Sequence, residues 1–270
     1  MTAETHAESP KGPEDDVAMG FFDHIGELRK RAIRAVIGLV PGIVIAWAYK
    51  EYLLDLFTRP LVDAFQRLGF AQTLHFKSLT DPFMAYMKIS LISGVLIASP
   101  WIFWQIWQFI APGLYRRERR LALPFVLAST VCFAGGAVFG YLIIFPMGFE
   151  TLLGLAGPLP SGEMRLVPTI MIDDFLTFAT RLLLAFGLVF EVPVVVTFLA
   201  AAGIVDWKQL LRFGRWWVVI AAVLAAILTP PDVGSMLMML IPLILLYYMS
   251  VGLAFFFGTK KPREPDPPPA

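Results

Sequence analysis

The chain has 270 residues, of which 57% are hydrophobic and only 16% are charged, whereas about a quarter of the residues in soluble domains are charged. This composition excludes an ordinary soluble domain and favours an integral membrane protein. The formal net charge of +1 argues against a nucleic-acid-binding protein, and the single cysteine, Cys132, excludes a disulfide or a cysteine-based metal framework.

The two ends of the chain differ in composition from the rest. Residues 1–20 are polar and acidic, and they lack the apolar core of a cleavable signal peptide, so we expect a disordered tail. Residues 258–270 are rich in proline and predict a second, extended tail. The membrane domain is therefore expected to occupy residues 21–257.

Between the tails, six stretches carry few charges, and four of them exceed the roughly 20 residues that a bilayer-spanning helix needs. In chain order they are residues 32–49, 83–107, 121–149, 175–204, 216–229 and 234–256. The fifth stretch is short, and only residues 230–233 separate it from the sixth, so these two helices should be tight antiparallel neighbours. The sequence thus predicts an all-α integral membrane protein with six transmembrane helices.

The distribution of lysine and arginine predicts the orientation of these helices. If the N-terminus is cytoplasmic, fifteen of these residues lie on the cytoplasmic side and five on the other side. Cytoplasmic segments carry an excess of positive charge, so we expect a multi-pass membrane protein with both termini in the cytoplasm.

Prolines recur within or at the ends of the predicted spans, and each removes a backbone donor and bends its helix. They are Pro41, Pro100, Pro124, Pro146, Pro193 and Pro242. Bent helices favour a concave, glove-like scaffold over a straight bundle. In the long loop of residues 50–82, an amphipathic pattern predicts short helices that Pro60 should break.

Motifs of catalysis and metal binding are missing from the sequence. It has no nucleophile elbow, zinc-protease pair, phosphate-binding loop or dinucleotide fingerprint. His24 and Glu27 are three residues apart on one helical face, but a di-iron site needs two copies of this pair in the opposite order. We therefore expect no enzyme, no metal and no cofactor.

Two acidic residues lie at the cytoplasmic edge of the predicted membrane domain. Glu27 precedes the first span and is an i,i+4 partner of Arg31, whereas Glu118 is flanked by four arginines in the stretch IAPGLYRRERRLALP. One interpretation is ordinary, with a solvated helix start at Glu27 and a surface ion network at Glu118. The other is that both acids converge on one ligand.

Glu191 lies about midway along the fourth span, where an acid costs about 2.5–3.5 kcal/mol to insert and is a functional candidate. Arg181 is not an obvious partner, because ten residues correspond to about 15 Å along a helix. Glu191 is therefore expected to be protonated or to face a watery cavity. The structural alternative is a hydrogen bond that holds two helices together.

Four motifs, in order, resemble the TatC family, the polytopic core subunit of the twin-arginine protein translocase. They are HIGELRKR before the first span, FIAPGLYRRERR after the second, FGLVFEVPV in the fourth and LTPPDV between the fifth and sixth. Four motifs in register, over residues 21–257, make the resemblance specific. It implies a receptor and scaffold that binds twin-arginine signal peptides and nucleates the complex that exports folded proteins.

The resemblance also implies roles for individual residues. The signal-peptide site would comprise Glu27, Glu118, Arg29, Phe109 and Tyr115. Its two acids suit a pair of arginines, because carboxylates bind planar guanidinium groups bidentately. Glu191 would be the buried intramembrane acid, Pro60 a structural residue of the first outer loop, and Thr229, Pro230 and Asp232 an interface for partner subunits. Physically, Asp232 could equally cap the sixth span. The implied partners are TatA-type and TatB-type single-span subunits, further copies of the chain and the lipid bilayer, and the implied energy source is the proton motive force.

A proton-coupled small-molecule transporter, with Glu191 as its relay, is the alternative function. Many transporters are built from repeated halves with broken helices at a midplane site. The sequence contains no such repeat.

Overall fold

The computed structural model describes residues 21–110, 122–158, 164–228 and 233–257. Within these ranges the chain is almost entirely helical, with one two-stranded antiparallel sheet. The elements are α1 (Phe21–Ala48), α2 (Lys50–Leu68), α3 (Asp81–Ile110), α4 (Ala122–Phe139), the π-helix η3 (Gly140–Ile144), α5 (Phe145–Leu153), β1 (Gly157–Pro158), β2 (Arg165–Leu166), α6 (Ile172–Phe190), α7 (Val192–Ala201), α8 (Trp207–Leu228) and α9 (Val233–Phe257).

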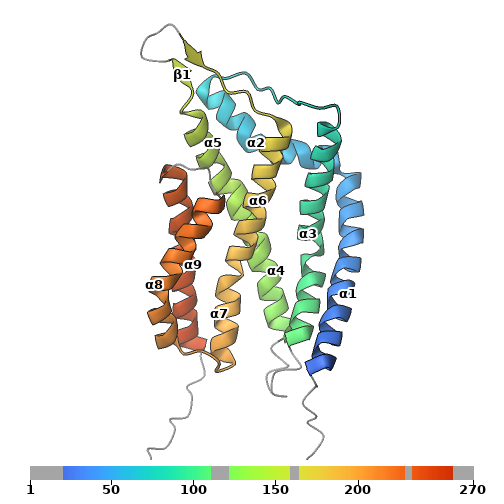
Figure 1. The fold of residues 1–270 in the computed structure, drawn as a ribbon, viewed down its shortest axis with the longest axis vertical. Coiled ribbons are helices and arrows are strands. Elements are labelled where there is room, and N and C mark those ends of the chain that lie inside the picture. The colour runs from blue at the N-terminus through green and yellow to red at the C-terminus, as the bar shows by residue number, and fades with distance from the viewer. Residues whose placement is uncertain (1–20, 111–121, 159–163, 229–232, 258–270) are drawn as a thin grey trace, which may run out of the picture.

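Among the described residues, six helical segments are long and apolar enough to cross a membrane, in agreement with the predicted number of spans. They run side by side, and α2 lies across one end of them, which we call the α2 end (Figure 1). The N-terminal end of α1 and the C-terminal end of α3 lie together at the opposite end, which we call the α1 end (Figure 1).

The fifth span is longer than the sequence predicted. The charges at Lys208, Arg212 and Arg215 do not end the helix, because α8 begins at Trp207 and contains 22 residues. At 1.5 Å per residue this helix is about 33 Å long, close to the thickness of a bilayer core. The expectation of a short fifth helix was therefore wrong, because a gap between charges measures apolar length and not helix length.

The prediction that Pro60 breaks the helices of the first long loop was also wrong. α2 is one continuous helix with a buried Pro60 inside it. Proline leaves the carbonyl four residues earlier without its helical donor, and here that carbonyl belongs to Leu56. The hydroxyl of Tyr141 donates to the Leu56 oxygen at 2.7 Å and so replaces the missing backbone bond. In α3, the Ser99 hydroxyl similarly donates to the Leu96 oxygen that Pro100 leaves free, at 2.8 Å.

Two other prolines coincide with departures from regular helix. η3 comes directly before Pro146, where the Phe145 amide bonds to the Gly140 oxygen in the five-residue pattern of a π-turn. The fourth span divides into α6 and α7 at Glu191, and Pro193 lies in the first turn of α7. Proline therefore bends this chain at particular positions, and the concave shape expected from such bends stays a prediction.

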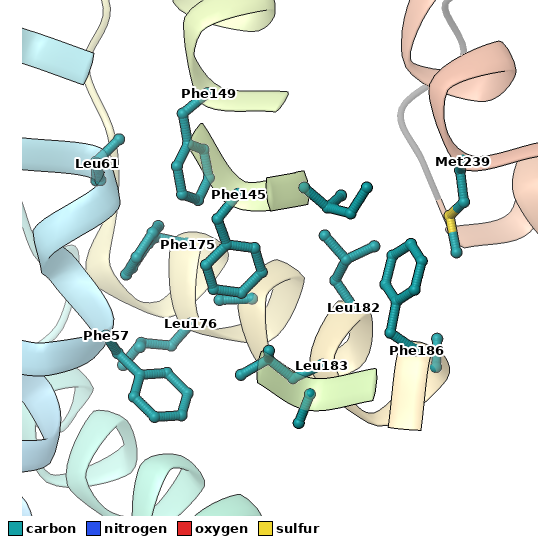
Figure 2. Packing of buried hydrophobic residues seen from close by; sticks show 14 of the residues in the cluster. Phe57, Leu61, Phe145, Phe149, Phe175, Leu176, Leu182, Leu183, Phe186 and Met239 are labelled. Carbon is teal, nitrogen blue, oxygen red and sulfur yellow. The ribbon is translucent and has the colours of Figure 1, made fainter. Parts of the chain in front are cut away.

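The largest hydrophobic core joins α2 to α5, α6 and α9. Leucine, alanine and phenylalanine side chains make up most of it, and Phe57 and Leu61 of α2 pack in it with Phe145, Phe149 and Phe175 (Figure 2). Phe145, Leu176 and Phe186 are fully buried. This packing fixes α2 across the end of the spans, because its apolar face is buried against theirs.

Ionic contacts at the α2 end connect the loop after α2 to α6. His75 pairs with the backbone of Ile170 and Ile172, and Lys77 Nζ lies 3.0 Å from Asp174 Oδ2. The hydrogen bond and charge of Asp174 raise the pKa of Lys77 above its ordinary value. Lys88 of α3 bonds to Asp173 and to Thr177 of α6. The loop, α3 and α6 therefore meet at a polar junction.

Glycines allow α1 and α3 to pack closely. A Cβ on Gly42 would lie 2.6 Å from the Gly94 carbonyl oxygen, and a Cβ on Gly38 would overlap the Trp101 ring. The Trp101 indole also donates to the Arg34 carbonyl oxygen at 2.9 Å. Because α1 packs mainly on α3, this contact sets the position of α1 relative to the rest of the molecule.

Candidate functional site

The candidate binding site lies at the α1 end and is centred on Glu27. This residue is in the first turns of α1, one turn before Arg31, and the predicted i,i+4 pair forms with 3.2 Å between Arg31 Nη2 and Glu27 Oε1. Both side chains are about one-fifth exposed. The second carboxylate oxygen, Oε2, is buried and has no hydrogen-bond partner among the described residues.

The C-terminal end of α3 completes the described part of this site. Arg31 Nη1 donates to Gln108 Oε1, so one guanidinium group connects α1 to α3. The His24 and Phe109 rings stack with their centroids 4.4 Å apart and an interplanar angle of 22°. Phe109, predicted from the resemblance, therefore lies beside the helical turn that carries Glu27. Gln108 was missed, because a polar residue near the end of an apolar span carries no signal of its own.

Of the other residues assigned to this site, the structure describes only Arg29. Arg29 is exposed, and no ion pair joins it to another described residue. Glu118 and Tyr115 belong to residues 111–121, which lie outside the described part of the chain. The last described residue before that segment, Ile110, ends α3 two residues after Gln108.

Glu191 occupies a different place, at the junction of α6 and α7. Its side chain is only 9% exposed, and Oε1 has no hydrogen-bond partner within the described ranges. Ser129 and the Phe133 backbone of α4 are close to its carboxyl group. The Trp107 indole nitrogen donates to Ser129 Oγ at 3.0 Å, so α3, α4 and the α6–α7 junction share one buried polar cluster.

The remaining assigned residues fall into two groups. Pro60 is buried inside α2, far along the chain from the Glu27 site. Thr229, Pro230 and Asp232 lie outside the described residues. Arg181 is exposed on α6 and forms no ion pair with Glu191 or another described residue. The described residues contain no group of three potential metal-binding side chains.

Comparisons with known proteins identify the family. Residues 23–242 match the family model described as Sec-independent protein translocase protein (TatC). The chain is 43% identical over 186 residues to the TatC protein of Desulforapulum autotrophicum, covering 69% of this chain and 66% of that relative. It is 36% identical over 200 residues to the TatC protein of Aquifex aeolicus, covering 74% of this chain and 80% of that relative.

A solved structure agrees with the sequence comparisons. The crystal structure of the twin-arginine translocase receptor TatC in DDM superposes with a TM-score of 0.75 at 36% identity, covering 88% of this chain and all of that one. These matches favour a protein-transport component over both an enzyme and the small-molecule transporter considered above. The chain, a multi-pass membrane protein, therefore belongs to the TatC family of Sec-independent protein translocase proteins.

Proposed function

We propose that this chain is the membrane receptor for twin-arginine signal peptides and the scaffold on which the export complex assembles. One observation carries the proposal: Glu27 presents a carboxylate at the α1 end, flanked by Gln108 and by the stacked His24–Phe109 pair. Such a group offers a guanidinium a charged acceptor next to an aromatic surface. The similar solved structure is itself described as a twin-arginine translocase receptor.

The peptide is expected to bind from the cytoplasm. The excess of lysine and arginine at the predicted inner segments supports an orientation in a bacterial inner membrane with both termini inside. The first arginine would pair with Glu27 and the second with Glu118, with Arg29 and Tyr115 nearby. Phe109 would contact the apolar part of the signal.

Partner subunits are proposed from the family alone. TatA-type and TatB-type single-span proteins would pack near Thr229, Pro230 and Asp232, and further copies of the chain would join the assembly. Glu191, a buried acid within a span, would supply a polar contact in this assembly or respond to the proton gradient.

Peptide binding tests the receptor assignment. Glu27→Gln and Glu118→Gln should each weaken binding of a twin-arginine peptide about ten- to a hundredfold, because each removes a charge-assisted contact of about 1.5–3 kcal/mol. Fluorescence anisotropy with the detergent-solubilised protein provides the measurement, and a dilysine peptide should bind more weakly to the unaltered chain. Glu51→Gln is the matched control, because Glu51 is an exposed acid in the first turn of α2. Unchanged binding in the double variant would reject the proposal.

A further inference from the structure

We propose that Arg31 occupies the place on Glu27 that a signal-peptide arginine takes, so that peptide binding exchanges one guanidinium for another. The inference rests on the proposed function, because it assumes that Glu27 receives an arginine of the peptide. Arg31 then acts as a built-in competitor, and the affinity of the receptor depends on how firmly α1 and α3 hold it.

The contacts of Arg31 are those expected of the ligand itself. Its Nη2 donates to Glu27 Oε1 at 3.2 Å, and its Nη1 donates to Gln108 Oε1. A guanidinium group has five N–H donors in a planar fork, which suits a carboxylate beside an amide oxygen. The side chains of α1 and α3 at this point therefore form a guanidinium-binding site, already filled by a residue of the same chain.

The bond to Glu27 is incomplete. A strong bond between guanidinium and carboxylate has a donor–acceptor distance of about 2.7–2.9 Å and commonly uses both oxygens. Here the distance is 3.2 Å, only Oε1 is used, and Oε2 is buried without a partner among the described residues. An arginine of the peptide, free of the i,i+4 spacing, can bond to both oxygens once the exchange uncovers Oε2. The Glu27 carboxylate should therefore bind an arginine of the peptide more strongly than it binds Arg31.

The position of Arg31 makes its release inexpensive. An i,i+4 pair on a helix surface is a weak interaction, so its removal changes an equilibrium by a small factor only. We therefore expect the competitor to lower peptide affinity about two- to fivefold.

A positioning role for Arg31 leads to the opposite result. If Arg31 instead holds the Glu27 carboxylate in the orientation that binds peptide, its loss disorders the site and weakens binding. Competition also scales the affinities of all cationic peptides by one factor, whereas a direct contact between Arg31 and the peptide would change their ratio. The sign of the effect and the arginine-to-lysine ratio therefore separate these roles.

The experiment compares Arg31→Ala with Arg34→Ala in the full-length protein in detergent. Arg34 is exposed, lies less than one turn along α1, and its side chain makes no ion pair with a described residue, so its removal corrects for the lost positive charge. Binding of labelled diarginine and dilysine peptides is measured by fluorescence anisotropy. We expect Arg31→Ala to bind both peptides two- to fivefold more tightly than Arg34→Ala, with an unchanged ratio.

Gln108 provides a second, independent measurement. Gln108→Ala should tighten peptide binding slightly in the unaltered chain and have no effect in the Arg31→Ala chain, because Gln108 acts by holding Arg31. Equal or weaker binding in Arg31→Ala than in Arg34→Ala would overturn the inference. If Glu27→Gln still weakens binding in that case, the receptor assignment stands. If Glu27→Gln has no effect, the receptor assignment itself is wrong. If Arg31→Ala does not fold, Arg31→Gln replaces it in the same comparison, because glutamine lacks the positive charge but keeps an amide that forms hydrogen bonds.

Discussion

At the residue scale, the hydrogen bond between Trp107 and Ser129 connects two spans inside the membrane domain. The indole nitrogen donates to Ser129 Oγ at 3.0 Å, and the two side chains are 4% and 1% exposed. A buried donor without an acceptor pays its full desolvation cost. The hydroxyl therefore satisfies the indole and also places a polar atom close to Glu191.

Ser129→Ala should lower the free energy of unfolding by about 1–3 kcal/mol, because it leaves the Trp107 N–H buried and unpaired. Thermal unfolding of the purified protein in detergent measures this loss. In a Trp107→Phe background the same substitution should cost much less, since no N–H then needs an acceptor. An equal cost in both backgrounds would contradict this account.

At the element scale, α2 depends on a side chain from another span. The Leu56 carbonyl lacks a helical donor because Pro60 has no N–H, and Tyr141 of η3 supplies the replacement at 2.7 Å. This bond ties the helix across the α2 end to the third span. It also explains why a proline near the middle of α2 does not end the helix.

Tyr141→Phe should destabilise the protein by about 0.5–1.5 kcal/mol, the usual value of one intramolecular hydrogen bond. The Pro60→Ala chain provides the matched test, because the new amide of Ala can bond to Leu56 and Tyr141→Phe should then cost less. Tyr52→Phe is the control, since Tyr52 is 78% exposed. Unfolding temperatures in detergent distinguish these variants, and a cost unaffected by Pro60→Ala would refute the compensation.

At the scale of the whole molecule, α1 is held mainly by α3, and the close approach at Gly42 and Gly94 sets their spacing. The same two helices carry Glu27 and Gln108 at the α1 end. The packing of small residues in the middle of the spans therefore determines the geometry of the proposed peptide site. α8 and α9 contribute to the largest core and also form a smaller one, in which Tyr247 donates to the Leu210 carbonyl oxygen at 2.7 Å.

Gly42→Ala should destabilise the protein by about 1–3 kcal/mol and weaken peptide binding, because its Cβ would lie 2.6 Å from the Gly94 oxygen and force the helices apart. Gly135→Ala is the control, since a Cβ there meets nothing within 4 Å. Because alanine has a higher helix propensity than glycine, Gly135→Ala should be neutral or up to about 1 kcal/mol more stable. Thermal unfolding and peptide titration together test this, and equal behaviour of the two variants would show that the spacing is not critical.

Much of the architecture was predictable from the sequence. The six apolar stretches gave the number of spans, because a helix must satisfy its own backbone in lipid and needs a minimum apolar length. The pair of Glu27 and Arg31 was predictable from spacing alone, since residues four apart are neighbours on a helix. Four ordered motifs also identified the family that the comparisons confirm.

The errors came from effects that local patterns do not contain. Pro60 was expected to end a helix, and α8 was expected to be short. Tyr141 supplies the hydrogen bond that Pro60 removes, so α2 continues past Pro60. α8 is long because the helix also includes the charged residues that precede its apolar stretch. In both cases the local rule described the residue correctly but did not include the neighbouring structure that sets the length of the helix.

The sequence by itself determined which segments cross the membrane, because apolar length and hydrogen bonding within a helix are local properties. Only the tertiary structure decided which polar groups meet. It placed Gln108 on Arg31, Phe109 on His24 and Ser129 near Glu191, pairs that lie 62 to 85 residues apart along the chain. Such contacts depend on which faces of two helices pack together, and that choice is made by side-chain shape across the whole bundle.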